Sequence, residues 1–358
     1  MQTARVEGQV EVVEELTFNR FNPVTESVQR VRVDGETLIR KTIRPDGEAG
    51  YRGWPSGPTV DHWNWWRREA DLYASDLAGW VHPGMRLPRL LRSVQLTDGR
   101  VELWLEDVTG RPGVEMSTEE AGRLAHAWGA TQARATGRPP EPWLARSWLP
   151  SFLAHRPVTS AAFEDEQAWA HPDVAAVIDA PLRRGLARLW EQRAWCCERL
   201  ATLPHTVTHH DLWPGNVIVP DDGVPVLVDW AMAGWSPVGL DVPVMVFDTF
   251  LDLLVDVERL DEVERAVTSR WLDGVSERID PDVALAGMHL SAVRFAWLPA
   301  KMIAELGGGR FGNVYLPDGV STADEWAARA PVFERMVQWF EKARSRYRGD
   351  RSTHPPGA

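Results

Sequence analysis

Cysteine is nearly absent from this sequence, which has two in 358 residues. Cys196 and Cys197 are adjacent, so they cannot form the disulfide framework on which small secreted proteins depend. A reducing compartment is therefore expected, and we predict a cytoplasmic protein. The segment around the pair, Asp179 to Leu200, has the apolar spacing of a helix. We expect both cysteines to be core residues, the alternative being a reactive pair.

Long apolar runs and an excess of positive charge are also lacking. No stretch of about 18 apolar residues suggests a membrane span, and residues 1–9 lack the basic and apolar blocks of a secretion signal. Lys and Arg total 39 against 51 Asp and Glu, a net charge of -12. Binding to nucleic acid or anionic membranes depends on cationic contacts, so we expect neither as a partner. A cationic small molecule is compatible with this charge.

Several common site motifs are missing. Neither G-x-x-x-x-G-K-[ST] nor H-E-x-x-H occurs. Residues Gly307 to Gly312 match G-x-G-x-x-G, but the segment before them, Leu290 to Leu306, has a helical pattern instead of a strand. They are therefore expected to end a helix and form a loop.

The most informative stretch runs from Thr208 to Trp230. Val217 to Pro220 and Val224 to Val228 are β-branched runs separated by Asp-Asp-Gly, which predicts a hairpin. Antiparallel neighbours lie about 5 Å apart, so Asn216, before the first strand, and Asp229, after the second, should be adjacent. Asp211 lies five residues before Asn216. Two carboxylates and a carboxamide at one end of a hairpin suit a hard cation such as Mg²⁺.

The same stretch carries a family resemblance. His209-x-Asp211-x-x-x-x-Asn216, a hairpin and Asp229 resemble the catalytic and metal-binding segments of protein kinases. The pattern His-x-Asp-Leu-x-Pro-Gly-Asn followed by Val-Asp-Trp is similar to the motifs of the aminoglycoside phosphotransferase (APH)/choline kinase-like family. The resemblance implies an α+β, bilobal protein-kinase-like fold, with an N-terminal antiparallel sheet lobe that contains one helix and a larger, mainly helical C-terminal lobe.

It also implies roles for residues of the hairpin region. Asp211 would orient the acceptor hydroxyl and take its proton, and His209 would brace the loop by hydrogen bonding. Asn216 and Asp229 would hold Mg²⁺. Asp241, which follows the hairpin, would bond backbone amides of the catalytic loop. His210 stands where the family often has glycine, and it would touch substrate or nothing.

Further roles fall in the N-terminal part. Val28 to Val33 and Thr37 to Ile43 flank Asp34-Gly35 and predict a second hairpin. The resemblance implies that Lys41 grips the phosphates of ATP or GTP, with Arg40 as a competitor because adjacent strand residues face opposite ways. Glu69, in a helix expected from Asp61 to Ala78, would pair with Lys41.

Two backbone segments complete the implied nucleotide site. The strand Val101 to Glu106 would end in a hinge that binds the base through backbone atoms of Glu106 to Val108. The loop over the phosphates, Asn22 to Ser27, contains no glycine. Protein kinases have a glycine-rich loop at this place. Thr25 and Ser27 would instead donate hydrogen bonds from their side chains, and the lack of glycine is expected to affect the affinity for nucleotide.

We predict an N-lobe at 1–107, a C-lobe at 108–345 and a disordered tail at 346–358. Within the C-lobe, Ser117 and Glu120 form a capping box that opens a helix. A helix from Val244 to Val257 would place Asp248, Asp252 and Asp256 on one face.

The predicted function is a small-molecule kinase that transfers the γ-phosphate of ATP or GTP to a hydroxyl. Two alternatives keep the fold: a kinase acting on Ser or Thr of a biosynthetic peptide, and a catalytically silent protein that binds nucleotide or peptide. A third is a hydrolase with a transition metal on residues of the same region, namely His205, His209, His210, Asp211 and Asp229. The acceptor, the donor base and the oligomeric state stay open.

Overall fold

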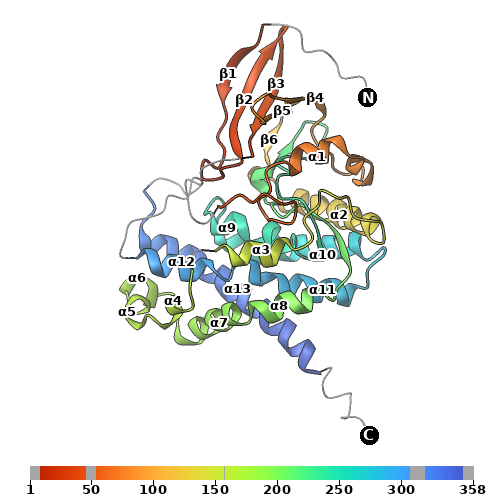
Figure 1. Cartoon of the computed structure of the whole chain (residues 1–358). Coiled ribbons are helices and arrows are strands. Elements are labelled where there is room, and N and C mark those ends of the chain that lie inside the picture. Colours follow the sequence, from red (N-terminus) through yellow and green to blue (C-terminus); the bar gives the residue numbers. More distant parts are fainter. Residues whose placement is uncertain (1–8, 46–53, 157, 307–318, 350–358) are drawn as a thin grey trace. The chain divides into compact units, whose positions relative to one another are not determined.

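The computed structural model describes residues 9–45, 54–156, 158–306 and 319–349 (Figure 1). Contacts divide the chain into two compact units. Unit 1 contains Met1–Ser117, Gly137–His155 and Val207–Ser236, and unit 2 contains Thr118–Thr136, Arg156–Thr206 and Pro237–Ala358. The predicted hairpin region thus belongs to the same unit as the N-terminal sheet. The lobe boundary expected at residue 107 stays a prediction.

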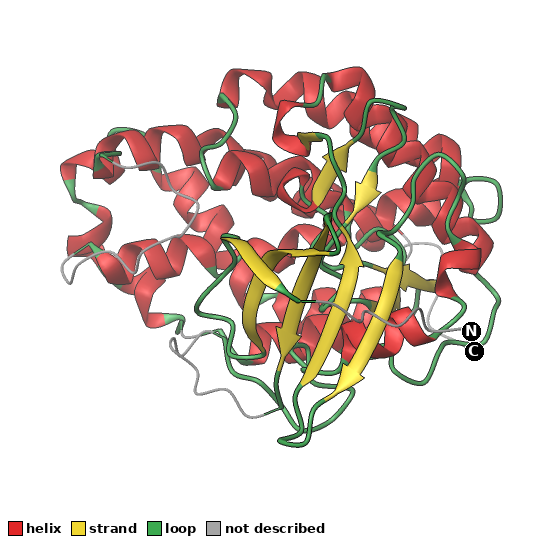
Figure 2. Ribbon diagram, turned by 90° about the horizontal axis from the view of Figure 1, so that it is seen from above, coloured by secondary structure: helices red, strands yellow, loops and turns green. Residues whose placement is uncertain are grey.

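A five-stranded antiparallel sheet forms the N-terminal part of unit 1, as the resemblance implied (Figures 1 and 2). Its spatial order is β1-β2-β3-β5-β4, with bounds Glu11–Glu15 (β1), Thr25–Val33 (β2), Glu36–Ile43 (β3), Leu90–Gln95 (β4) and Val101–Glu106 (β5). Asp34 and Gly35 turn the β2–β3 hairpin with φ of 50° and 89°. Both central residues of such a turn need positive φ, which explains the predicted Asp-Gly turn.

The helix expected at 61–78 is much shorter. Helix α1 spans Arg68–Ala74, residues 61–67 form turns, and the 3₁₀ helix η1 follows at Leu77–Trp80. Trp63 is fully buried, and its ring meets those of Trp148 and Phe152 edge-on, with centroids 6.2 and 5.3 Å away. Trp63 therefore belongs to an aromatic cluster and not to a helical face.

The predicted hairpin is present but shorter than expected. Strand β8 spans Val217–Val219 and pairs antiparallel with β9, Val226–Leu227. The short strand β6 (Arg111–Pro112) pairs with the other edge of β8. The other elements of this region are η2 (Gly113–Glu115), α3 (Trp148–Ala154), β7 (His205–Thr208), η3 (Pro214–Asn216) and β10 (Gly234–Pro237), with β7 and β10 forming a two-stranded sheet.

Unit 2 is mainly helical. Its helices are α2 (Thr118–Ala135), α4 (Ala161–Glu164), α5 (Glu166–Trp169), α6 (Pro172–Ala175), α7 (Ala180–Glu191), α8 (Arg193–Leu200), η4 (Val244–Asp248), α9 (Thr249–Leu251), η5 (Val257–Arg259), α10 (Leu260–Val275), α11 (Pro281–Leu290), η6 (Ser291–Phe295), α12 (Leu298–Glu305) and α13 (Thr322–Gly349). Helices α2 and α10 pack backbone to backbone through Gly129 and Gly274. A Cβ at Gly129 would lie 2.4 Å from the Trp271 carbonyl oxygen, and one at Gly274 would lie 2.2 Å from that of His126. Side chains at these two positions would separate the helices.

Three expectations about unit 2 need correction or limits. The helix predicted from Val244 to Val257 ends at Leu251, and Leu253 has φ 58°, so the three aspartates do not share a helical face. The predicted disordered tail is helical as far as Gly349. Residues 350–358 and the glycine-rich segment at 307–312 lie outside the described residues.

The cysteines behave largely as expected. Cys196 on α8 is fully buried and Cys197 is partly buried, and neither is in a disulfide. Burial raises the pKa of both thiols, that of Cys197 to about 11. A thiol with a raised pKa is a poor nucleophile at neutral pH, in agreement with a packing role.

One described segment, Pro281–Glu305, is long and apolar enough to span a membrane, but most of its most apolar window is buried inside the fold. Core helices of soluble proteins have the same two properties, so this segment is weak evidence for a span.

Candidate active site

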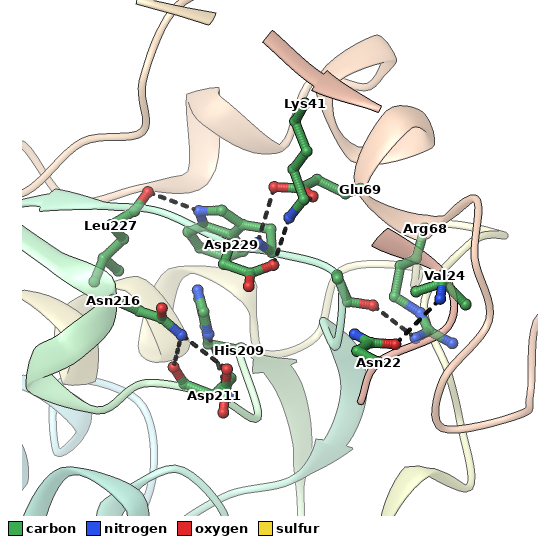
Figure 3. Close-up of polar contacts among 12 residues, drawn as sticks. Asn22, Val24, Lys41, Arg68, Glu69, His209, Asp211, Asn216, Leu227 and Asp229 are labelled. Carbon is green, nitrogen blue, oxygen red and sulfur yellow. Dashed lines mark hydrogen bonds and ion pairs between the residues drawn. The ribbon is translucent and has the colours of Figure 1, made fainter. Parts of the chain in front are cut away.

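Lys41 lies at the centre of a three-residue ionic contact within unit 1 (Figure 3). Its Nζ is 2.6 Å from Glu69 Oε2 and 2.8 Å from Asp229 Oδ1. The lysine is 6% exposed. Burial lowers the pKa of Lys41, but the carboxylates of Asp229 and Glu69 together outweigh burial and raise it above its usual value. The ammonium is therefore charged throughout the physiological range.

Arg40 points away from this contact. Its Nε donates to Gln29 Oε1 at 3.0 Å, and its guanidinium lies over the Trp104 ring, 5.5 Å from the centroid. Strand residues alternate between the two faces of a sheet. The structure accordingly brings Lys41, and not Arg40, to Glu69 and Asp229.

Glu69 connects helix α1 to the segment that follows β9. It is 1% exposed, and its Oε1 accepts a hydrogen bond from the Trp230 amide at 3.3 Å. Burial raises the pKa of Glu69, and the Lys41 ammonium opposes that rise. Glu69 thus contacts the lysine with one oxygen and the chain just after Asp229 with the other.

Asp229 has a left-handed backbone, with φ 57°, and its side chain is 45% exposed. Burial of its surroundings raises the pKa of this carboxyl, but contact with Lys41 lowers it by more, so the net pKa is depressed. The carboxylate is open to solvent on one side. An ionised and accessible carboxylate is suited to binding a cation.

The loop before β8 forms a second polar group (Figure 3). Asn216 Nδ2 donates to the Asp211 carbonyl oxygen at 2.9 Å and to Asp211 Oδ2 at 2.8 Å. The Asp211 amide donates to His209 Nδ1 at 3.3 Å, and the His209 ring is buried 4.5 Å from the Trp230 ring. His209 therefore braces the loop and is not exposed to substrate.

The ends of the hairpin lie together, as the sequence predicted. Val217 pairs with Leu227, and the Val228 amide donates to the Asn216 carbonyl oxygen at 3.0 Å. Asn216 uses its NH₂ group on Asp211, which leaves Oδ1 as a ligand atom, and Asp229 supplies a carboxylate. Mg²⁺ commonly takes one or two such protein oxygens and completes its shell with phosphates and water, so the donor set fits this metal.

The hydrolase alternative would need a different donor set. Among the residues that the structure describes, no group of three or more His, Cys, Asp or Glu side chains could hold a metal ion. His210, one of its proposed ligands, already bonds two hydroxyls. The donor set therefore favours a hard cation over a transition metal.

His210 has a role that the sequence did not reveal. The residue is fully buried with φ 62°, which disfavours substrate contact among the two alternatives that the sequence left open. Its Nε2 is 2.8 Å from both Thr208 Oγ1 and Ser236 Oγ, and its ring stacks on Trp148 with centroids 4.1 Å apart. Thr208 donates its own proton to the Gly234 carbonyl oxygen at 3.0 Å. It must then accept from His210, which places a proton on Nε2.

The predicted phosphate loop begins and ends earlier than expected. Strand β2 already starts at Thr25, so residues 16–24 connect β1 to β2. Thr25 is 8% exposed, and Ser27 is half-buried within the strand. The structure therefore does not present Thr25 on a loop. Asn22 in the connection accepts from the Asn64 side chain at 3.0 Å and from the Val24 amide at 3.4 Å.

The predicted hinge follows β5. Both oxygens of Glu106 accept from Arg86 at 3.0 Å. Burial raises the pKa of Glu106, and the Arg86 and Arg89 contacts more than reverse that change. The Glu106 amide donates to the Arg89 carbonyl oxygen at 2.9 Å, so it is not available to a base. The backbone of Val108 makes no hydrogen bond to any described residue, and its binding of the base stays a prediction.

Asp241 is fully buried in unit 2. It accepts from Trp128 Nε1 at 2.9 Å and from Gln132 Nε2 at 3.5 Å, both on α2. Its implied bonds to amides of the catalytic loop, which is in the other unit, stay a prediction.

Comparison with known proteins agrees with this arrangement. The model of the phosphotransferase enzyme family (APH) matches residues 66–272, more than half of the chain. An aminoglycoside phosphotransferase from Alicyclobacillus acidocaldarius is similar in structure, with TM-score 0.51, 16% identity, and coverage of 94% of this chain and 92% of its own. The amicoumacin kinase hAmiN, solved in complex with AMP-PNP, Ca²⁺ and Ami, has TM-score 0.50 and 13% identity, and the match covers 93% of this chain and 89% of its own. No curated protein matches the sequence significantly.

The match to the family model covers α1, the loop with Asp211 and the β8–β9 hairpin. The similar structures share the fold along nearly the whole chain. The chain therefore belongs to the phosphotransferase enzyme family, has a protein-kinase-like fold, and is a kinase that transfers phosphate to an alcohol group.

Proposed function

We propose that this protein is a small-molecule kinase that transfers the γ-phosphate of ATP or GTP to a substrate hydroxyl. The observation that carries the proposal is the contact of Lys41 with Glu69 and Asp229, in the same compact unit as the Asp211–Asn216 pair. Phosphoryl transfer needs an aligned acceptor, neutralised phosphate charge and a proton acceptor. These residues supply the second and third requirements.

Asp211 is the proposed base. Asn216 fixes Oδ2 and the carbonyl oxygen of Asp211, and the His209 ring holds its amide. A carboxylate fixed in this way can orient a hydroxyl and accept its proton as the bond to phosphorus forms. Such general-base help typically contributes about 10²- to 10⁴-fold to the rate.

Asn216 Oδ1 and the Asp229 carboxylate are the proposed ligands of Mg²⁺. When bound, the metal neutralises charge on the β- and γ-phosphate oxygens. Lys41 is aimed by Glu69 at the same region, so that its ammonium contacts phosphate. Val108 would bind the base, and Ser27 stays a proposed phosphate contact.

The acceptor is proposed to be a small molecule. The two similar structures are named as an aminoglycoside phosphotransferase and an amicoumacin kinase. The net charge of -12 favours a cationic acceptor such as an amino sugar. A Ser or Thr of a biosynthetic peptide is the alternative acceptor.

The proposal is tested by thermal shift with ATP or GTP and Mg²⁺, followed by turnover on a panel of acceptors. A ligand at 100 times its dissociation constant stabilises a protein by about 2.7 kcal/mol, so binding is measurable. Asp211→Asn should lose turnover by about 10²-fold or more and keep the nucleotide shift. Asp229→Ala should lose the Mg²⁺-dependent part of the shift.

Asp222→Asn is the matched control, because this exposed turn residue only caps the Val224 amide and asparagine can do the same. Full turnover in Asp211→Asn would refute the assignment of the base. A shift without turnover on any acceptor would favour a silent nucleotide-binding protein, to which the glycine-free connection at 16–24 also points.

A further inference from the structure

Arg68, the first residue of α1, is a fully buried cation in unit 1. Its Nη1 donates to the carbonyl oxygens of Trp63 at 2.9 Å and Ala231 at 3.0 Å. Its Nη2 donates to those of Val60 and His62, both at 2.8 Å. Three of the four acceptors belong to residues 60–64, which we call the junction loop. The fourth lies two residues after Asp229.

This arrangement is energetically demanding. Burial lowers the pKa of the Arg68 guanidinium to about 9, although Asp61 favours the charged form. A buried charge with no carboxylate in hydrogen-bond contact is strongly destabilising unless polar groups compensate for the lost water. Here four carbonyl oxygens compensate for it. Each of them is consequently held in a fixed position by the guanidinium.

The carbonyl that matters for the site is that of Ala231. A left-handed backbone costs a residue other than glycine about 1 kcal/mol or more, and Asp229 has φ 57°. The two residues that follow Asp229 are held from α1. Glu69 accepts from the Trp230 amide, and Arg68 donates to the Ala231 carbonyl oxygen. Two consecutive residues of α1, Arg68 and Glu69, therefore hydrogen-bond the two residues that follow Asp229.

The junction loop connects these hydrogen bonds of α1 to other parts of unit 1. Its Asn64 side chain donates to Asn22 in the β1–β2 connection at 3.0 Å. Its Trp63 amide donates to Ser151 Oγ on α3 at 3.2 Å, and α3 also carries Trp148, on which His210 stacks. The β1–β2 connection, the Asp229 segment and the catalytic loop thus share one support.

We propose that Arg68 is a positioning residue that fixes the Asp229 carboxylate for metal binding by holding the carbonyl oxygen of Ala231. The inference rests on the proposed function, in which Asp229 binds Mg²⁺. Arg68 does not touch substrate, nucleotide or metal. Its effect is exerted through the backbone, so it should appear in the metal dependence of the enzyme.

The test compares Arg68→Lys with the wild type. Lysine keeps the charge but cannot span four carbonyl oxygens with a planar fork. The measurement is the Mg²⁺ concentration that gives half of the full nucleotide-induced thermal shift. We expect it to rise about tenfold or more, the usual effect of losing a residue that orients a metal ligand. Nucleotide affinity at saturating Mg²⁺ should change by about twofold or less, because Lys41 and Val108 are untouched.

Arg67→Lys is the matched control. Arg67 is the neighbouring arginine, but its side chain is 40% exposed and bonds Asp71 and Gln95. It should leave the Mg²⁺ midpoint unchanged. A purely structural role for Arg68 would lower the melting temperature of the apo protein and leave that midpoint unchanged.

Ser151→Ala provides a second, milder variant in case Arg68→Lys does not fold. It removes the acceptor of the Trp63 amide, and Trp63 is one of the residues that Arg68 holds. The Mg²⁺ midpoint should rise in the same direction by about two- to threefold, an effect of less than 1 kcal/mol. If the folded variants, Arg68→Lys and Ser151→Ala, keep the Mg²⁺ midpoint of the wild type, the inference about Arg68 is overturned but the proposed function is not. A wild-type protein without any Mg²⁺-dependent nucleotide shift would overturn the proposed function and the inference with it.

Discussion

Replacing His210 by alanine and by glycine isolates the strain stored in the backbone next to Asp211. Both changes delete the imidazole, and with it the stack on Trp148 and the contacts to Thr208 and Ser236. The stack accounts for about 0.5–1.5 kcal/mol, and each hydrogen bond for about 1 kcal/mol. These losses are common to the two variants, so they cancel in the comparison.

The difference between the variants comes from φ 62° at this position. A Cβ in the left-handed region costs alanine about 1–2 kcal/mol relative to glycine. Glycine gives back about 0.4–1 kcal/mol, because its unfolded chain is more flexible. The midpoints of these two ranges differ by about 0.8 kcal/mol, and we expect His210→Gly to be more stable than His210→Ala by about that amount. Urea unfolding followed by tryptophan fluorescence measures this difference, provided that the two variants unfold with the same slope.

A second substitution tests the same geometry independently. A Cβ on Gly234 would lie 2.7 Å from His210 Nε2 and 3.0 Å from the Ala145 carbonyl oxygen. Gly234→Ala should therefore destabilise the wild type more than it destabilises the His210→Gly variant, in which the ring is absent. The reasoning is refuted if alanine at 210 is as stable as glycine, or if the effects of Gly234→Ala and His210→Gly are additive, since residues in contact should couple.

Two further outcomes follow from the geometry and the pKa shifts. Lys41→Met should reduce turnover by at least about tenfold, the effect of losing roughly 1.4 kcal/mol of transition-state stabilisation. Arg40→Met should leave turnover within about twofold of the wild type, because Arg40 faces Gln29 and Trp104. Equal losses of turnover in the two variants, measured in steady-state assays, would contradict the assignment of Lys41. Burial, with Lys342 and Arg346 nearby, lowers the pKa of His289 to about 4 from 6.5. Between about pH 6.5 and pH 4, His289 is protonated in the unfolded chain but not in the folded chain. The free energy of unfolding should therefore fall as the pH drops through this range, by at most about 3 kcal/mol. Unfolding titrations of His289→Gln should show a flatter profile in that window, and an unchanged profile would rule this residue out as the cause.

The parts of the site encoded by neighbouring residues were predictable from the sequence. Two β-branched runs around Asp-Asp-Gly define a hairpin, and the hairpin alone places Asn216 beside Asp229. Because side chains of adjacent strand residues face opposite sides of a sheet, the sequence left Lys41 and Arg40 as alternatives for the phosphate contact. The structure shows that Lys41 is the one that faces Glu69. In the N-terminal sheet, the β2–β3 hairpin was predictable from its Asp-Gly turn, whereas the sheet as a whole was implied by the family resemblance.

Features that depend on distant partners were not predictable. The helix expected at 61–78 is cut short because Trp63 is buried against α3, more than 80 residues away in the sequence. His210 was judged by its neighbours in the motif, whereas its environment is set by Trp148. The role of Arg68 was not predictable either, because nothing in the local sequence shows that four carbonyl oxygens converge on it.

The Lys41 contact also determines the charge of the site. One ammonium faces the two carboxylates of Glu69 and Asp229, so negative charge exceeds positive charge within this contact. A free nucleoside triphosphate, itself strongly anionic, is repelled by such a site. A divalent cation that accompanies the nucleotide cancels this repulsion, so the protein should discriminate between the metal complex and the bare nucleotide before any chemistry occurs. Selection of the metal complex over the bare nucleotide would then follow from the charge of these side chains alone.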